Sequence, residues 1–152
     1  MDVAILAEPV YTLNRDKLRP LAWVRDIFPA INNVVGVTSA KVAREKPEEL
    51  RAILRAHRRA VVFIGDHRDE AAAIAAKVYK LDPSVVRSVM DGLLDHPSNG
   101  VPFWSQGDFR WADLDAMMIA LKSMGLPEAD ADWRHLVDQD FLPVDLRRDL
   151  GK

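Results

Sequence analysis

Apolar residues that recur every three or four positions constrain the fold of this chain most strongly, and they begin after Ser39. Pro47 stands at a first-turn position, followed by Glu48 and Glu49, where acidic side chains favour the positive end of a helix dipole. Leu50, Ile53, Leu54, Val61 and Ile64 continue the stripe. This spacing predicts an amphipathic helix that ends at Gly65.

The same reasoning predicts three more helices. Asp66 is expected to cap an alanine-rich helix that reaches about Lys80, and Asp82 followed by a proline predicts the next helix start. A fourth helix begins near Trp111 and ends at Gly125. Asp95–Gly107 is predicted to be a loop, with short helices over residues 132–137 and 143–150. We expect burial of Leu50, Ile53, Leu54, Val61, Val89, Leu114 and Leu121.

The first 38 residues have a different pattern. Short apolar runs at Val3–Leu6, Leu21–Val24 and Asn33–Thr38 predict strands, because turn-forming prolines and asparagines separate them. The predicted fold class is therefore helix-rich α/β. A chain of 152 residues is long enough for one domain, here with a strand and hinge-like segment over 1–38 and a helical part over 39–152.

Composition narrows the function classes. The formal charge is −2, which gives no indication of a nucleic-acid or membrane-surface protein. Without cysteine the chain has no disulfide or thiolate metal site. No apolar run approaches the roughly 20 residues of a membrane span, and the N-terminus lacks the features of an export signal. We expect a periplasmic location if the full gene encodes a signal peptide, and a cytoplasmic one if the chain is complete as written.

Three segments, in order, resemble a known family. They are Asp2–Pro9, the run Val34–Ser39 that leads into Ala43–Leu50, and Asp140–Pro143. Together they are similar to substrate-binding proteins of ABC importers for nitrate, sulfonates, taurine and thiamine precursors. Each motif is short and apolar, so their order and spacing carry the resemblance.

The resemblance implies a type II periplasmic-binding-protein fold, in which two α/β lobes close on a ligand. The chain would correspond to the last strand of the second lobe followed by the C-terminal helices of the first. It is interpreted as a fragment, an engineered piece or a naturally shortened relative. The implied function is binding of a small organic or anionic solute, with an ABC permease as partner. Two alternatives remain: a helical interaction module that oligomerises without solute, and a cytoplasmic sensor.

Candidate ligand-binding residues lie in the N-terminal segment. The resemblance places Glu8 and Pro9 at the cleft, where the carboxylate could accept hydrogen bonds from an amine or a heterocyclic N–H. Tyr11 and Trp23 could stack on a planar ligand, although core packing is an ordinary role for Trp23. Asn33, like its neighbour Asn32, is a candidate polar contact, and turn chemistry explains both as well.

Catalytic and metal-binding signatures are not found, so we expect neither enzymatic activity nor a cofactor. The chain has no glycine-rich phosphate loop, no nucleophile elbow and no cysteine. Its four histidines lack metal-ligand spacing. Asp113 and Asp115 are too close in sequence to face each other on a helix, and are interpreted as solvated. The arginines of the long helix are interpreted as a solvated face: Arg51, Arg55, Arg58 and Arg59.

The strand pattern also predicts self-association. Val3–Leu6 and Val34–Val37 would have exposed edges, which a symmetric homodimer could pair. In the competing interpretation, Asp95–Gly107 and the terminal helices fold over the strands and complete a monomer.

Overall fold

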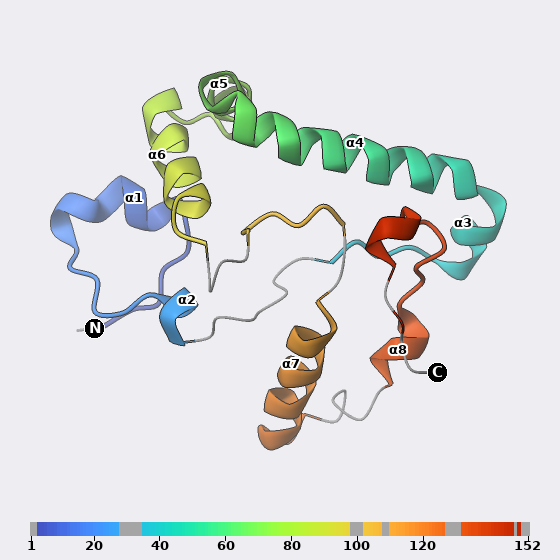
Figure 1. Cartoon of the computed structure of the whole chain (residues 1–152). Coiled ribbons are helices and arrows are strands. Elements are labelled where there is room, and N and C mark those ends of the chain that lie inside the picture. The colour runs from blue at the N-terminus through green and yellow to red at the C-terminus, as the bar shows by residue number, and fades with distance from the viewer. Residues whose placement is uncertain are drawn as a thin grey trace. The chain divides into compact units, whose positions relative to one another are not determined.

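The computed structural model describes residues 3–27, 35–97, 102–107, 110–126, 132–147 and 149. In these residues all regular structure is helical (Figure 1). The α-helices are α1 (Val10–Asn14), α2 (Val24–Ile27), α3 (Ala40–Glu45), α4 (Pro47–Asp66), α5 (Arg68–Tyr79), α6 (Pro83–Leu94), α7 (Trp111–Ser123) and α8 (Trp133–Leu136). Two short 3-10 helices, η1 (Arg15–Lys17) and η3 (Val144–Leu146), add to them. Within the described ranges, no helix combines the length and the hydropathy that a membrane crossing needs.

The prediction of a helix-rich chain is confirmed, but the predicted strands are not seen in the described residues. Val3–Leu6 and residues 35–38 are irregular and exposed, and Val24 begins helix α2. Asn33 and Val34 lie outside the described residues. A strand needs a neighbouring strand to receive its backbone hydrogen bonds, and the described part of the chain offers none. A short apolar run therefore gave no reliable indication of a strand here.

The chain forms two compact units, each built from two separate stretches of sequence. Unit 1 contains Met1–Pro29 and Val61–Trp104, and unit 2 contains Ala30–Ala60 and Ser105–Lys152. Helix α4 contributes its first fourteen residues to unit 2 and its last six to unit 1.

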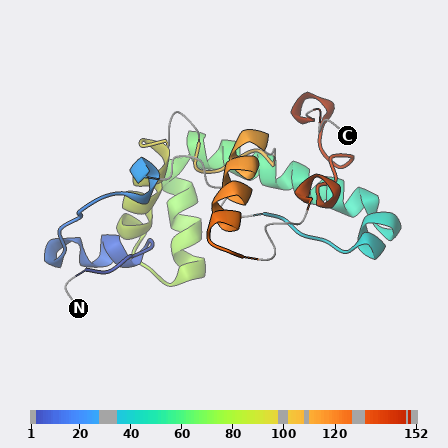
Figure 2. The same cartoon turned by 90° about the horizontal axis from the view of Figure 1, so that it is seen from below.

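The core of unit 1 lies between α5 and α6, which pack side by side (Figures 1 and 2). Helix α1 contacts α6 in the same unit. Small alanine side chains on α5 let the two helices approach closely, so that larger side chains of α6 fill the contact. The buried residues are Ala71, Ala72, Ala76, Val86 and Met90, with Phe63, Ile64, Ala75, Leu81 and Trp104 packed around them.

The boundaries of these helices follow their local chemistry, with one correction. Asp66 does not cap α5. Helix α4 continues through Gly65 to Asp66, and His67 N donates a hydrogen bond to the Phe63 carbonyl (2.8 Å). Helix α5 begins at Arg68 with His67 in the cap position, and the His67 side chain makes no capping hydrogen bond. Asp66 therefore belongs to the last turn of α4 and does not stand at the cap position of α5. The cap predicted at Asp82 is confirmed, because its Oδ1 accepts a hydrogen bond from Ser84 N at 2.8 Å.

An ion-pair cluster joins the start of α5 to α6. Arg68 donates hydrogen bonds to Asp91 (3.0 Å) and Asp95 (2.8 Å). Arg87 donates to both carboxylate oxygens of Asp91 at 2.9 Å and to Asp69. Hydrogen bonds to Asp95 and then Asp91 raise the pKa of Arg68. Burial opposes ionisation of Asp91, but the hydrogen bonds from Arg87 and Arg68 outweigh it and lower its pKa.

We expect the stabilising contribution of this ion-pair cluster to be lost in acid. A carboxyl group whose pKa is lower when folded contributes stability above its unfolded pKa, and this contribution is lost as the pH falls through the folded value. The loss therefore occurs below about pH 4, the ordinary value for aspartate. Asp91→Asn should lower the melting temperature at pH 7, and its melting temperature should fall less than that of the parent between pH 5 and pH 3. Circular dichroism melts measure both, and equal pH slopes would contradict the prediction.

Unit 2 is built on the first part of α4. His57 Nε2 lies 2.9 Å from the Ser105 carbonyl, and Arg58 donates to Gln106 Oε1 at 3.3 Å. Gly107 has a φ of 97°, a backbone conformation that glycine adopts without strain. Its backbone stands close to Leu54 and Leu142, so the loop packs on the apolar stripe of α4.

Of the seven predicted core positions, one is buried, five are half-buried and one is exposed. Leu114 is buried, whereas Leu50, Leu54, Val61, Val89 and Leu121 are half-buried. The predicted burial of Ile53 is wrong, because its side chain is exposed. Ile53 lies about 60° round the helix from Leu50, on the side away from Leu54. The loop at residues 105–107 packs on the Leu54 side. The apolar stripe of α4 is therefore wider than the surface that this loop covers.

Candidate functional site

The candidate site lies in the N-terminal segment of unit 1, where helix α1 begins. Pro9 directly precedes α1, and Glu8 Oε2 accepts a hydrogen bond from Thr12 N at 3.2 Å. A carboxylate in this position satisfies one of the free amides of the first helical turn. Glu8 remains exposed, so its carboxylate can still accept hydrogen bonds from a ligand.

Two of the predicted aromatic residues meet in the structure. The ring centroids of Tyr11, on α1, and Trp23, before α2, are 5.1 Å apart, and their planes form an angle of 86°. This edge-to-face arrangement is favourable for aromatic pairs. Both residues are half-buried, and neither belongs to the α5–α6 core.

Arg25 is part of the same cluster, and sequence reasoning did not single it out. Its Cζ lies 4.7 Å from the centroid of the Trp23 ring, within the range of a cation–π contact. The only signal in the sequence was an arginine two residues after a tryptophan, which is too common a pattern to single out. The pair of rings thus carries a positive charge on one side.

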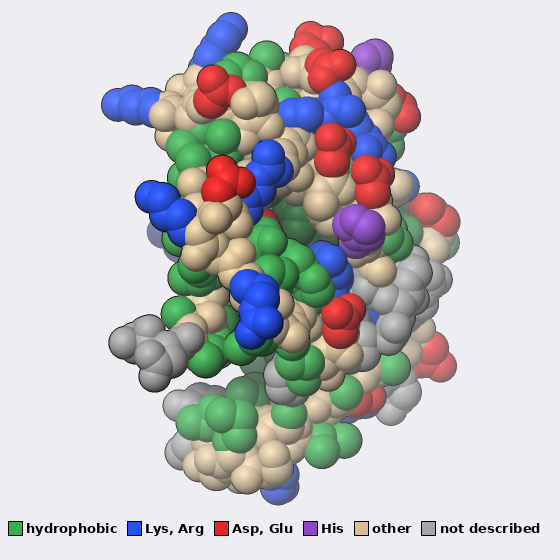
Figure 3. Space-filling model, turned by 90° about the vertical axis from the view of Figure 1, so that its left-hand side faces the viewer, with side chains coloured by type: hydrophobic (Ala, Val, Ile, Leu, Met, Phe, Trp, Pro, Cys, Tyr) green, Lys and Arg blue, Asp and Glu red, His purple; other side chains and the backbone are tan. Residues whose placement is uncertain are grey.

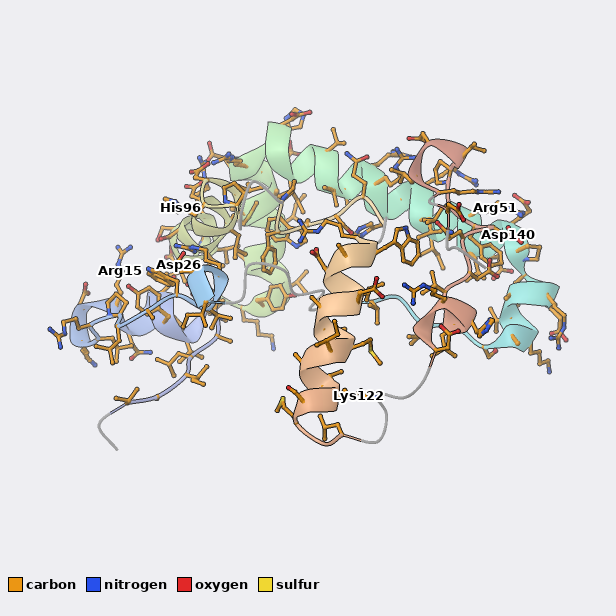
Figure 4. The ribbon with its side chains drawn as sticks, turned by 60° about the horizontal axis from the view of Figure 1, so that its bottom comes forward. Arg15, Asp26, Arg51, His96, Lys122 and Asp140 are labelled. Carbon is orange, nitrogen blue, oxygen red and sulfur yellow. The ribbon has the colours of Figure 1, made fainter. Side chains whose placement is uncertain are left out.

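Helix α1 has a further contact on α6 that helps to position this cluster. Arg15 Nη1 lies 3.4 Å from Ser88 Oγ of α6, and Figure 4 shows Arg15 just after α1. The fifth candidate, Asn33, lies outside the described residues, as does Asn32. The structure therefore brings together Tyr11 and Trp23 and places Glu8 and Pro9 at the start of the same helix.

Two of the four arginines of α4 contact other side chains and two are exposed, and none of them belongs to the candidate site. Arg51 forms an ion pair with Glu48 (2.6 Å), and its Cζ lies 5.5 Å from the centroid of Phe141. Figure 4 shows Arg51 beside the segment that carries Asp140. Arg58 is 3.8 Å from Asp145. Arg51 and Arg58 are half-buried, so the interpretation as a solvated face is wrong for these two, whereas Arg55 and Arg59 are exposed as expected.

The remaining titratable candidates form separate local contacts. Asp113 pairs with Arg110 and has only 13% of its side chain exposed, so its interpretation as a solvated charge is wrong. Asp115 pairs with Arg134 at 2.9 Å. His67 stacks on Phe63 with the centroids 4.9 Å apart. Among the described residues, no three histidine or acidic side chains form a group able to hold a metal ion.

Comparison with known protein families, with curated proteins and with solved structures gives no match to this chain.

Proposed function

We propose that this chain is a solute-binding component of an ABC importer, or the C-terminal part of one, and that its N-terminal cluster contacts the solute. The observation that carries this proposal is the contact between Tyr11 and Trp23, two residues selected from the sequence as ligand contacts and twelve positions apart. The three motifs that resemble importer binding proteins support the same class. The ABC permease as partner rests on that resemblance.

The chemistry of the cluster suits a small planar or anionic solute. An aromatic pair offers a flat apolar surface on which a ring can stack. The guanidinium of Arg25 beside Trp23 favours an anionic group such as a sulfonate or nitrate. Glu8 can accept a hydrogen bond from an amine or a pyrimidine N–H. Sulfonates, nitrate-like anions and aminopyrimidines are therefore the solutes to test.

We expect this chain alone to bind such solutes only weakly, with dissociation constants of about a millimolar or higher. Tight small-molecule sites enclose roughly 70–90% of the ligand surface, whereas the half-buried Tyr11–Trp23 pair covers one face. The four tryptophan indole N–H signals can be followed by ¹⁵N nuclear magnetic resonance during titration. A ligand of the cluster should shift the Trp23 signal selectively, and Trp23→Phe identifies that signal.

Tyr11→Ala should weaken this binding, whereas Tyr79→Ala provides a matched control. Tyr79 is the other tyrosine of the chain and stands on α5, outside the cluster. A solute that shifts Trp104 or Trp111 and leaves Trp23 unchanged would contradict the proposed site. A micromolar dissociation constant would contradict the expected weak binding.

One observation favours the second candidate function, a helical interaction module that oligomerises without solute. Large apolar side chains are exposed on several helices of the described chain, among them Val78, Ile119 and Leu136. Figure 3 shows hydrophobic side chains open at the surface between charged ones. Such surfaces commonly mark protein contacts. The solute titration at Trp23 separates the two candidates, because only the solute-binding protein requires a selective shift of that signal.

A further inference from the structure

Helix α5 carries large apolar side chains that the core of unit 1 leaves exposed. Its alanines Ala71, Ala72 and Ala76 pack in the α5–α6 core. Ile74 lies about 60° round the helix from Ala71 and is 51% exposed, and at the end of the helix Val78 and Tyr79 are 71% and 72% exposed. Ile74 and Val78 are four positions apart and so lie one above the other on the same side of the helix.

Unpaired charges flank this exposed face in a specific order. Glu70 lies one turn before Ile74, and Lys77 lies about one turn after it. Neither side chain takes part in an ion pair with any other residue of the chain that the structure describes. Asp69, next to Glu70, instead pairs with Arg87 of α6. Along the helix, this exposed face therefore carries an acidic, then an apolar, then a basic side chain.

This order makes the face complementary to itself. When two copies of α5 pack antiparallel about a two-fold axis near Ile74, the two Ile74 side chains meet at the centre. Glu70 of each copy then lies across from Lys77 and Val78 of the other, because the positions are related by the two-fold axis. A parallel arrangement would instead place like charges together, which is unfavourable.

We propose that the Glu70–Ile74–Lys77–Val78 face of α5 binds the same face of a second copy of this chain. Helix α4 provides a comparison, because it also exposes apolar Ile53 but the two acidic residues of its first turn are already matched. Glu48 pairs with Arg51, and Glu49 pairs with Lys46. The unpaired charges of α5 require a partner surface that presents a basic side chain opposite Glu70 and an acidic one opposite Lys77. A second, antiparallel copy of α5 presents both.

This surface is distinct from the proposed solute site. Tyr11 and Trp23 lie on α1 and before α2, whereas the proposed contact uses α5 only. Solute binding and self-association can therefore fail independently of each other. The homodimer expected from sequence relied on strand edges, and Val3–Leu6 is not a strand in the structure.

Charge reversal with analytical ultracentrifugation tests the proposal. A contact between two 12-residue helices is small, so we expect a weak dimer that forms over roughly 10–500 micromolar chain. Glu70→Lys and Lys77→Glu should each raise the dissociation constant at least about fivefold, since each places like charges across the contact twice. The double swap of both residues should restore the parental value to within about twofold. Ile74→Ser should abolish association.

Matched controls are available on α3, where Glu45 and Lys41 are exposed. Glu45→Lys and Lys41→Glu change the net charge equally and should leave the dissociation constant unchanged. Circular dichroism checks that each variant keeps its helices, and the double swap controls for altered charge at the ends of α5. A single species near the 17.1 kDa monomer mass at 500 micromolar parent chain would overturn the proposal. So would dimerisation that is insensitive to both reversals, or a double swap that does not recover.

Discussion

Met90→Ala should lower the free energy of unfolding of unit 1 by about 2–3 kcal/mol, because it leaves a cavity between α5 and α6. Met90 is 6% exposed and belongs to the same cluster as Ala72 and Val86. The alanines of α5 have no side-chain length with which to fill the space. Since small domains are stable by only about 5–15 kcal/mol, the variant should lose a large part of the total. Urea unfolding followed by circular dichroism measures the change.

Met124→Ala removes the same atoms from a side chain that is 72% exposed, just after α7. This control should change the free energy of unfolding by less than about 0.5 kcal/mol. Trp104 packs against the Met90 cluster, so its fluorescence gives a second measure of the same transition. Similar losses of unfolding free energy for the two methionine variants would contradict the assignment of Met90 to the core between α5 and α6.

The start and end of several helices could be predicted because these signals are local. Pro47 begins α4, Asp82 caps α6, and Gly125 follows the end of α7 with a φ of 73°. Each depends on backbone chemistry within one turn, which the sequence contains in full. The cap predicted at Asp66 was wrong, because α4 continues through Asp66 and α5 starts two residues later, after His67.

The strands could not be predicted reliably, because a strand depends on a partner that is distant in sequence. Val3–Leu6 has the composition of a buried strand, yet its residues are exposed and irregular. Ile53 shows the same limit within a helix, since the apolar stripe of α4 did not reveal which side the loop near Gly107 covers. Packing partners decide both cases.

The candidate site was predicted in part. Tyr11 and Trp23 were selected because aromatic residues in a loop-rich segment can stack on a ligand, and the structure brings their rings together. Arg25 was missed, because its position over the Trp23 ring depends on the path of the chain before α2. The self-complementary face of α5 was also missed, since its meaning depends on knowing that the alanines pack inward.

The largest effect in unit 2 is expected from Leu142→Ala, with a loss of about 2–4 kcal/mol in the free energy of unfolding. Leu142 is 5% exposed. A methyl group of Leu142 lies 3.8 Å from the point where a Cβ on residue 107 would stand, and one of Leu54 lies 3.6 Å from it. Truncation would therefore open the contact through which the loop packs on α4. Arg147 Nε also donates to the Leu142 carbonyl at 2.9 Å, which helps to keep this segment in place.

Leu136→Ala is the matched control, because Leu136 of α8 is 77% exposed. Its truncation should cost less than about 0.5 kcal/mol. Hydrogen exchange of the His57 and Arg58 amides gives a local measure, since Ser105 and Gln106 contact these two side chains. Exchange should accelerate there in Leu142→Ala and remain unchanged in α6, which belongs to unit 1. Equal costs for the two leucine truncations would contradict the assignment of Leu142 to the core of unit 2, because only a side chain removed from water leaves a cavity when it is shortened.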